Sequence, residues 1–121
     1  MLELVNAERS KRGIGPMYIH PKLQYTAQWK ANDMITYGYF AHVKPGETEA
    51  NGLLKIREQN IGCGWIAENL LSTSPQYHTS RQAIKLWMGS PSHRSSILDS
   101  KYNRTGFGVN GNKVVQHFCQ L

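Results

Sequence analysis

The apolar residues in the first half of the chain recur at helical spacing. Residues 2–12, LELVNAERSKR, predict a helix that ends at Gly13. Residues 20–37 predict a longer helix, with Pro21 near its start and Gly38 at its end. The apolar face of this longer helix consists of Leu23, Ala27, Ala31 and Met34. Two helices are therefore expected within the first 38 residues.

The pattern changes in the middle of the chain. The Pro-Gly pair at 45–46 is typical of a type II turn, and residues 53–60 predict a short helix. Residues 64–71, GWIAENLL, predict a strand with large apolar groups at both parities, namely Trp65, Ile66, Leu70 and Leu71. We therefore expect this strand to be covered on both faces.

The second half contains cap signals for two more helices. Residues 72–80 are polar and predict a loop. Thr79, followed three residues later by Gln82, forms a capping box for the apolar face of RQAIKLWM. Ser90 is suited to the N-cap and Pro91 to the first helical position of the next helix.

Residues 104–121 predict a β-hairpin, because two strand-like runs flank the Asn110-Gly111 pair. Glycines at 106, 108 and 111 also spell GxGxxG. A dinucleotide-binding fingerprint needs a helix after the glycines, whereas a second strand is predicted here. A hairpin with flexible glycines is the better interpretation.

The composition fits one soluble domain over residues 1–121. The chain has 121 residues, of which 40% are hydrophobic and 18% charged. No apolar run approaches the ~20 residues of a bilayer-spanning helix. The N-terminus also lacks the charged-then-apolar layout of a signal peptide, so no transmembrane segment is expected.

The formal charge of +6 raises the question of polyanionic partners. Cations cluster only in ERSKR, where Arg9, Lys11 and Arg12 fall in the last turn of the first predicted helix. Positive charge there favours the helix dipole, so we interpret the cluster as a solvated helix end. No specific nucleic-acid binding is predicted, while contact with an anionic cell-wall polymer or membrane surface stays open.

Cys63 and Cys119 are the only cysteines, and their spacing fits no metal motif. They form either one long-range disulfide or two buried thiols. We favour the disulfide if the protein occupies an oxidising compartment, where closing so long a loop would stabilise the fold by about 4 kcal/mol.

Three polar residues occupy positions that are unusual for solvent-exposed side chains. Glu68 shares strand parity with Ile66 and Leu70, so it is expected to be buried and to need donors or a charge partner. His42 lies where the long helix gives way to a loop, and His93 is in the first turn of a capped helix. Imidazoles can provide donors for Glu68 and ligands for a metal, although each alone also fits a core or cap position. No role is assigned to the other histidines, His20, His78 and His117.

At these stretches the sequence resembles the CAP superfamily, or SCP domain, which contains cysteine-rich secretory proteins, antigen 5 and pathogenesis-related proteins. It is most similar to the compact bacterial branch. The resemblance covers nearly the whole chain: the opening helices, GYFAHV, WIAENLL, LWMGSPSHRSSIL and the closing TGFGVNG and VVQHF.

The resemblance implies an α+β fold, a three-layer α-β-α sandwich around a central antiparallel sheet, with an open cleft. His42, Glu68 and His93 match cleft positions of the family, and in several members the two histidines bind zinc or another divalent ion. Two ligands are too few for a closed zinc site, so weak, exchangeable binding completed by water is expected. A secreted, extracellular or cell-envelope location is also implied.

Three hypotheses follow for the cleft. In the first, it belongs to a binding module that holds a divalent metal and recognises a lipid, peptide or cell-wall ligand. The alternative is a metal-dependent hydrolase with Glu68 as base, although Ser90 stands where larger members carry a second glutamate. In the third, Glu68 bridges His42 and His93 structurally. A carboxylate between them would raise the pKa of both imidazoles, so that protonation would expel metal.

Overall fold

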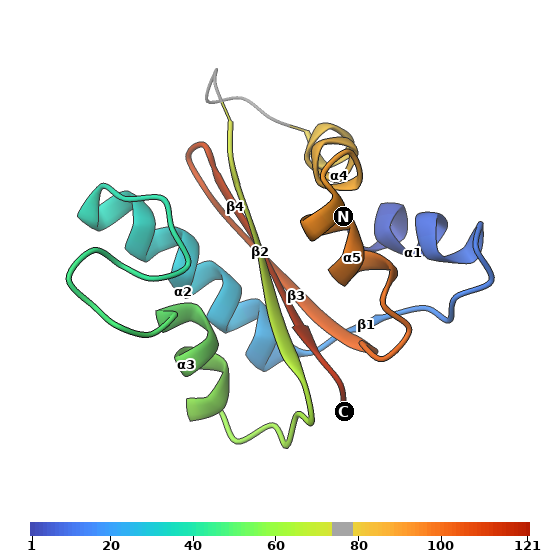
Figure 1. The fold of residues 1–121 in the computed structure, drawn as a ribbon, viewed down its shortest axis with the longest axis horizontal. Helices are drawn as coiled ribbons and strands as arrows, with labels where there is room; N and C mark the ends of the chain where they lie inside the picture. Colours follow the sequence, from blue (N-terminus) through green and yellow to red (C-terminus); the bar gives the residue numbers. More distant parts are fainter. Residues whose placement is uncertain (74–78) are drawn as a thin grey trace.

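The computed structural model describes residues 1–73 and 79–121, which form helices on both faces of a mixed sheet (Figure 1). The helices are α1 (Leu2–Ser10), α2 (Pro21–Tyr37), α3 (Asn51–Glu58), α4 (Ser80–Met88) and α5 (Pro91–Leu98). The strands are β1 (Tyr18–Ile19), β2 (Ile66–Ser72), β3 (Arg104–Asn110) and β4 (Lys113–Cys119). Most of the predicted polar loop, including His78, lies outside the described residues. None of the described helices is long and apolar enough to cross a bilayer.

The α+β class and the three layers are confirmed. Figure 1 shows α2 and α3 on one face of the sheet and α1, α4 and α5 on the other. The strand order is β1-β3-β4-β2, in which β4 pairs antiparallel with both β3 and β2. The two-residue β1, which the sequence did not predict, pairs parallel with β3 and makes the sheet mixed. This order leaves β2 with a free edge.

Local signals set the ends of the helices largely as predicted. The imidazole Nδ1 of His20 accepts a hydrogen bond from the Lys22 backbone N–H at 3.1 Å, so His20 is the N-cap of α2. Gly38 ends this helix at a φ of 64°, in the left-handed region that favours glycine. Thr79 Oγ1 accepts from the Gln82 N–H at 3.1 Å, which confirms the predicted cap of α4.

The two turns agree with their sequence signals, one with a shift. Gly46 has a φ of 90°, as the third residue of a type II turn requires, and the Glu47 N–H donates to the Lys44 carbonyl at 2.9 Å. In the hairpin, Asn110 pairs with Lys113. The turn therefore consists of residues 111–112, one position later than predicted.

Two glycines of the GxGxxG string are required by packing. A Cβ at Gly106 would collide with the backbone of Leu23, and one at Gly108 would collide with the backbone of Ala27. Helix α2 thus lies directly on the β3 backbone at these points. The prediction of flexible glycines was wrong at these two positions, because close approach of the helix excludes any side chain.

Strand β2 is covered on both faces. Leu70 packs in the core beneath α2, and Leu71 packs against the core on the side of α1 and α4. Trp65 was expected to contribute to this burial, but it precedes the strand and is 59% exposed. Residues Cys63 and Cys119 form a disulfide that joins the segment before β2 to the end of β4. The favoured pairing is confirmed.

The interpretation of Arg9 as part of a solvated helix end was wrong. Arg9 shares the buried face of α1 with Val5 and is 1% exposed. Its guanidinium donates to the carbonyls of Gly15, Ile97, Asp99 and Tyr102 at 2.7–2.9 Å. Only Lys11 and Arg12 remain at the surface, where both pair with Glu8.

Candidate functional site

Two successive residues of β2 reach into opposite helical layers. The Glu68 side chain, only 1% exposed, points toward α2 and α3, where it meets His42. Asn69 points the other way, and its Nδ2 donates to the backbone carbonyl of His93 in α5 at 3.0 Å. Because side chains alternate along a strand, β2 links one predicted cleft histidine on each side.

Glu68 is held by two imidazoles, one of which was not predicted. Its Oε1 accepts from His42 Nδ1 at 2.8 Å, and its Oε2 accepts from His117 Nε2 at 2.7 Å. His117 is fully buried and lies directly opposite Glu68 on β4. Its Nδ1 is 2.7 Å from Thr26 Oγ1 in α2. A chain of hydrogen bonds therefore links Thr26 of α2, by way of His117 and Glu68, to His42.

The structural hypothesis predicted that Glu68 bridges His42 and His93, and this prediction was wrong. The second bridged histidine is His117, because the β2–β4 register places it across from Glu68. His93 instead pairs through Nδ1 with the hydroxyl of Ser90 at 2.9 Å. Ser90 occupies the N-cap position of α5, but its side chain makes no cap hydrogen bond.

The ionisation of Glu68 is set by these partners. Burial by itself raises the pKa of the carboxyl group, but hydrogen bonds from His117 and His42, together with the charges of His117 and Lys30, lower it to about 2. Glu68 is therefore ionised at neutral pH. Both histidines then donate to it, which leaves His42 with Nε2 as its available nitrogen.

Gly52, in the first turn of α3, makes room for the carboxylate. A Cβ at this position would overlap Glu68 Oε2 and lie 3.2 Å from His117 Nε2. Glycine is thus required here by close approach of a neighbouring side chain. The sequence offers no local sign of this role, since Gly52 follows an ordinary polar loop.

A buried cation holds the loop that carries His42. Lys30 of α2 is fully buried, and its Nζ donates to the carbonyls of Ala41 and His42 at 2.8 and 3.1 Å and to Asn51 Oδ1 at 2.6 Å. Burial lowers the pKa of this amine, while the charges of Glu68 and Asp33 oppose the shift. Lys30 therefore positions the backbone of His42.

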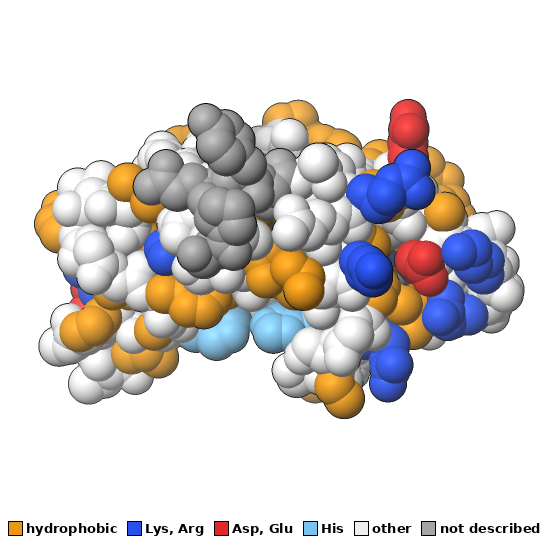
Figure 2. Space-filling view, turned by 90° about the horizontal axis from the view of Figure 1, so that it is seen from above, with side chains coloured by type: hydrophobic (Ala, Val, Ile, Leu, Met, Phe, Trp, Pro, Cys, Tyr) orange, Lys and Arg blue, Asp and Glu red, His pale blue; other side chains and the backbone are white. Residues whose placement is uncertain are grey.

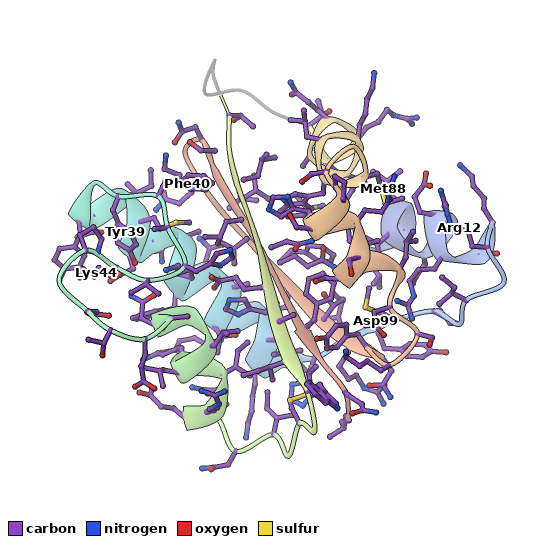
Figure 3. The ribbon with its side chains drawn as sticks, in the orientation of Figure 1. Arg12, Tyr39, Phe40, Lys44, Met88 and Asp99 are labelled. Atoms are coloured by element: carbon purple, nitrogen blue, oxygen red, sulfur yellow. A yellow bond between two sulfur atoms is a disulfide. The ribbon has the colours of Figure 1, made fainter. Side chains whose placement is uncertain are left out.

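Tyr39 and Asp33 complete the support of this loop. The Tyr39 hydroxyl donates to Asp33 Oδ2 at 2.6 Å, and Asn51 Nδ2 donates to both groups. Burial and the Asp33 hydrogen bond raise the pKa of Tyr39. Figure 3 shows Tyr39 on the α2 and α3 side of the sheet, opposite Met88 and Asp99 on the other layer.

The environment of His93 differs from the predicted one. Burial lowers its pKa, and the positive charge of His42 lowers it further. The expected rise is therefore not found for His93. Figure 2 shows two histidine side chains adjoining above a notch in the molecular outline.

Among residues 1–73 and 79–121, no group of three or more His, Cys, Asp or Glu side chains is arranged to hold a metal ion. A groove of about 690 Å³ lies elsewhere, between the end of α3, the segment before β2 and its first residue, Ile66. His42, Glu68 and His93 do not line it.

The sequence matches the family model described as the cysteine-rich secretory protein family, CAP, over residues 2–121. The chain therefore belongs to the CAP family, as its resemblance predicted. An uncharacterized Bacillus subtilis protein, YkwD, is 32% identical over 108 residues, which are 89% of this chain and 40% of YkwD. The B. subtilis membrane protein YlbC is 28% identical over 122 residues, covering 99% of this chain and 33% of YlbC. The chain spans less than half the length of either relative.

Solved structures show the same fold. An extracellular SCP-domain protein from Bacillus anthracis has a TM-score of 0.86 at 21% identity, over 99% of this chain and 39% of that one. An outer surface protein from Borrelia burgdorferi has a TM-score of 0.83 at 18% identity, over 98% and 88%. A cysteine-rich secretory protein from Staphylococcus aureus has a TM-score of 0.80 at 21% identity, over 99% and 36%.

Proposed function

We propose that this chain is an extracellular CAP domain whose cleft binds a divalent metal ion, such as zinc, through His42 and His93. The ion and the surrounding cleft then bind a ligand at the cell surface, drawn from lipids, peptides and cell-wall components. The module binds its ligand and does not transform it.

The observation that carries this proposal is the use of Nδ1 by both histidines. His42 Nδ1 pairs with Glu68, and His93 Nδ1 pairs with Ser90. Each imidazole therefore has Nε2 as its remaining nitrogen. A histidine whose other nitrogen donates to a carboxylate is a common arrangement at zinc sites, because the carboxylate fixes the tautomer and increases the basicity of the ligand.

The residues present fit a weakly held ion. Two imidazoles leave the remaining coordination positions to water or ligand, as at an exchangeable site. The lowered pKa of His93 favours the neutral imidazole that a metal requires at neutral pH. When bound, the ion would supply a Lewis-acid centre for an oxygen of the ligand.

The surroundings of Glu68 favour binding over hydrolysis. A general base needs an available oxygen and a pKa near the working pH. Both oxygens of Glu68 accept hydrogen bonds from histidines, its side chain is 1% exposed, and its pKa is about 2. Glu68 is therefore suited to orienting His42. Among the described residues, no carboxylate other than Glu68 pairs with His42 or His93.

Two observations support an extracellular location. The disulfide between Cys63 and Cys119 is typical of proteins that fold outside the reducing cytosol. The similar structure from B. anthracis is of an extracellular protein, and that from B. burgdorferi is of an outer surface protein.

The test is a zinc titration followed through the imidazole nitrogen signals of the protein by NMR. Zinc should shift the Nε2 signals of His42 and His93 and leave their Nδ1 signals within the hydrogen-bonded range. His20, which uses Nδ1 to cap α2, is the internal control and should not respond. Equal responses of His20, His42 and His93, or none, would rule the proposal out.

A further inference from the structure

The cleft contains an unpaired stretch of sheet edge. Strand β2 is the last strand in the order β1-β3-β4-β2, and within residues 1–73 and 79–121 it pairs only with β4. Figure 1 shows β2 in front of the sheet, with no described helix or strand drawn across its free side. An open edge presents backbone donors and acceptors to any chain that can reach it.

The hydrogen bonds at the two ends of β2 show which residues face this edge. The Trp65 carbonyl accepts from the Gln120 N–H, and the Thr73 N–H donates to the Asn112 carbonyl, both at 2.9 Å. In an antiparallel pair, residues directed at the partner strand alternate with residues directed away from it. The odd-numbered residues of β2 therefore bond to β4. The even-numbered residues, including Glu68, direct their backbone groups outward.

Side chains cap two of these outward groups and leave the middle open. Trp87 Nε1 donates to the Leu70 carbonyl at 3.1 Å, and the Tyr102 hydroxyl donates to the Ile66 carbonyl at 3.5 Å. Within the described residues, the N–H and C=O of Glu68 have no partner. Glu68 as a whole is 8% exposed whereas its side chain is 1% exposed, so its exposed part is backbone.

The two cleft histidines lie on either side of this position. His42 is bonded to the Glu68 side chain from one helical layer, and His93 is fastened by Asn69 from the other. We infer that the occupant of the cleft is an extended peptide, which pairs its main chain with the backbone N–H and C=O of Glu68 and lies beside the two imidazoles.

The chemistry of the edge selects a peptide among the candidate ligands. One residue of an extended peptide carries an N–H and a C=O at the spacing needed to satisfy both groups of Glu68 together. A lipid chain offers neither group. Because the carbonyls on both sides of Glu68 are already capped, the pairing covers about one residue pair. The protein therefore recognises a short stretch of peptide main chain, and most side chains of the peptide do not affect binding.

The inference rests on the proposed function in that both use the same cleft, but the two can fail separately. Amide hydrogen exchange of the free protein comes first. The Glu68 N–H should exchange on the order of a hundred times faster than those of Ala67 and Asn69, which bond to β4. Equal protection at all three positions would show that the edge is already covered, and would overturn the inference.

The second arm adds a mixture of random hexapeptides with acetylated and amidated ends. Exchange at Glu68 should slow about tenfold when nine-tenths of the protein is bound. A matched mixture with every backbone nitrogen methylated has no N–H to donate to the Glu68 carbonyl and should have no effect. Equal protection by both mixtures, or protection by phospholipid vesicles or soluble cell-wall glycan instead, would overturn the inference.

Zinc binding measured on the same samples separates the two proposals. Zinc coordination at His42 and His93 without peptide protection of Glu68 would contradict the peptide and leave the metal site standing. Peptide protection without zinc coordination would support the peptide and contradict the metal-binding function.

Discussion

The two helical layers each carry one of the proposed metal-binding histidines, and among the described residues each contains one fully buried cation. On the α2 side, Lys30 donates to the carbonyls of Ala41 and His42. On the α1 side, Arg9 donates to carbonyls at the end of α5 and beyond it, including those of Ile97 and Asp99. In both layers a buried charge satisfies backbone carbonyls that irregular segments leave unpaired.

The difference lies in how close each cation is to its histidine. Lys30 bonds to the backbone of His42 itself, whereas Arg9 holds the opposite end of the helix that carries His93. Lys30 also lies close enough to Glu68 to lower the pKa of that carboxyl. Arg9 thus stabilises the fold only, whereas Lys30 both stabilises the fold and positions His42.

The largest effect should come from Arg9→Met. This change removes the buried donor to the carbonyls of Gly15, Ile97, Asp99 and Tyr102, so the free energy of unfolding should fall by about 4 kcal/mol in urea titrations. Zinc affinity of the folded fraction should stay within about twofold of the parent, because no contact with His93 itself is lost. Arg12→Met, at an exposed ion pair, is the control and should cost less than about 1 kcal/mol. Loss of zinc binding in folded Arg9→Met would contradict the conclusion that Arg9, unlike Lys30, does not position a zinc-binding histidine.

Lys30→Met should lower both stability and zinc affinity. The methionine side chain fills a similar space but cannot donate a hydrogen bond, so we expect a loss of about 3 kcal/mol in the free energy of unfolding. The released His42 backbone should weaken zinc binding about tenfold in calorimetry. Lys85→Met, at an exposed position of α4, is the matched control and should change neither quantity. Unchanged zinc affinity in Lys30→Met would show that the loop does not depend on this amine.

The pH dependence of stability should reveal Glu68. Its folded pKa of about 2 is below the ordinary value of 4.5, so the unfolded state binds the proton more tightly. The resulting stabilisation is present above pH 4.5 and is lost as the pH falls toward 2, by about 3 kcal/mol in total. Urea titrations at several pH values should show a smaller acid loss in Glu68→Gln. Exposed Glu58→Gln should retain the parent's loss, and an identical acid profile in Glu68→Gln would contradict the assignment.

Gly52→Ala and Gly89→Ala form a matched pair, one in each layer. The added methyl group at residue 52 overlaps the Glu68 carboxylate, whereas at residue 89 it would lie 3.5 Å from its nearest neighbours, an ordinary contact. Gly52→Ala should therefore cost about 2 kcal/mol and weaken zinc binding, while Gly89→Ala should be within about 1 kcal/mol of the parent. Thermal unfolding and calorimetry check both changes, and equal effects would refute the role of Gly52.

Much of the fold could be predicted because its signals are local. The long helix is marked by a proline, an apolar stripe and a terminal glycine, and the hairpin by strand-like runs around a turn. The parallel strand β1 was missed because two residues are too few to show alternation. The roles of Gly106 and Gly108 depend on which helix lies over β3, and no local pattern contains that information.

The part of the site that depends on alternation along one strand could be predicted from the sequence. The part that depends on how two strands pair could not. Glu68 was expected to be buried from its neighbours on β2, but its partner His117 depends on the pairing of β2 with β4. Alternation of Val115, His117 and Cys119 on one face of β4 was the available signal. The buried cations were also marked: Arg9 lies one turn from Val5, and Lys30 lies on the stripe of Ala27 and Met34.

The central claim is that one imidazole from each layer holds the same ion. The most direct measurement is calorimetric zinc titration at neutral pH of the parent, His42→Ala, His93→Ala and the double variant. The account predicts that either single change removes nearly all of the binding and that the double variant is no worse, because two ligands of one ion are strongly non-additive. Parent-like affinity in either single variant, or losses that simply add in the double variant, would contradict it.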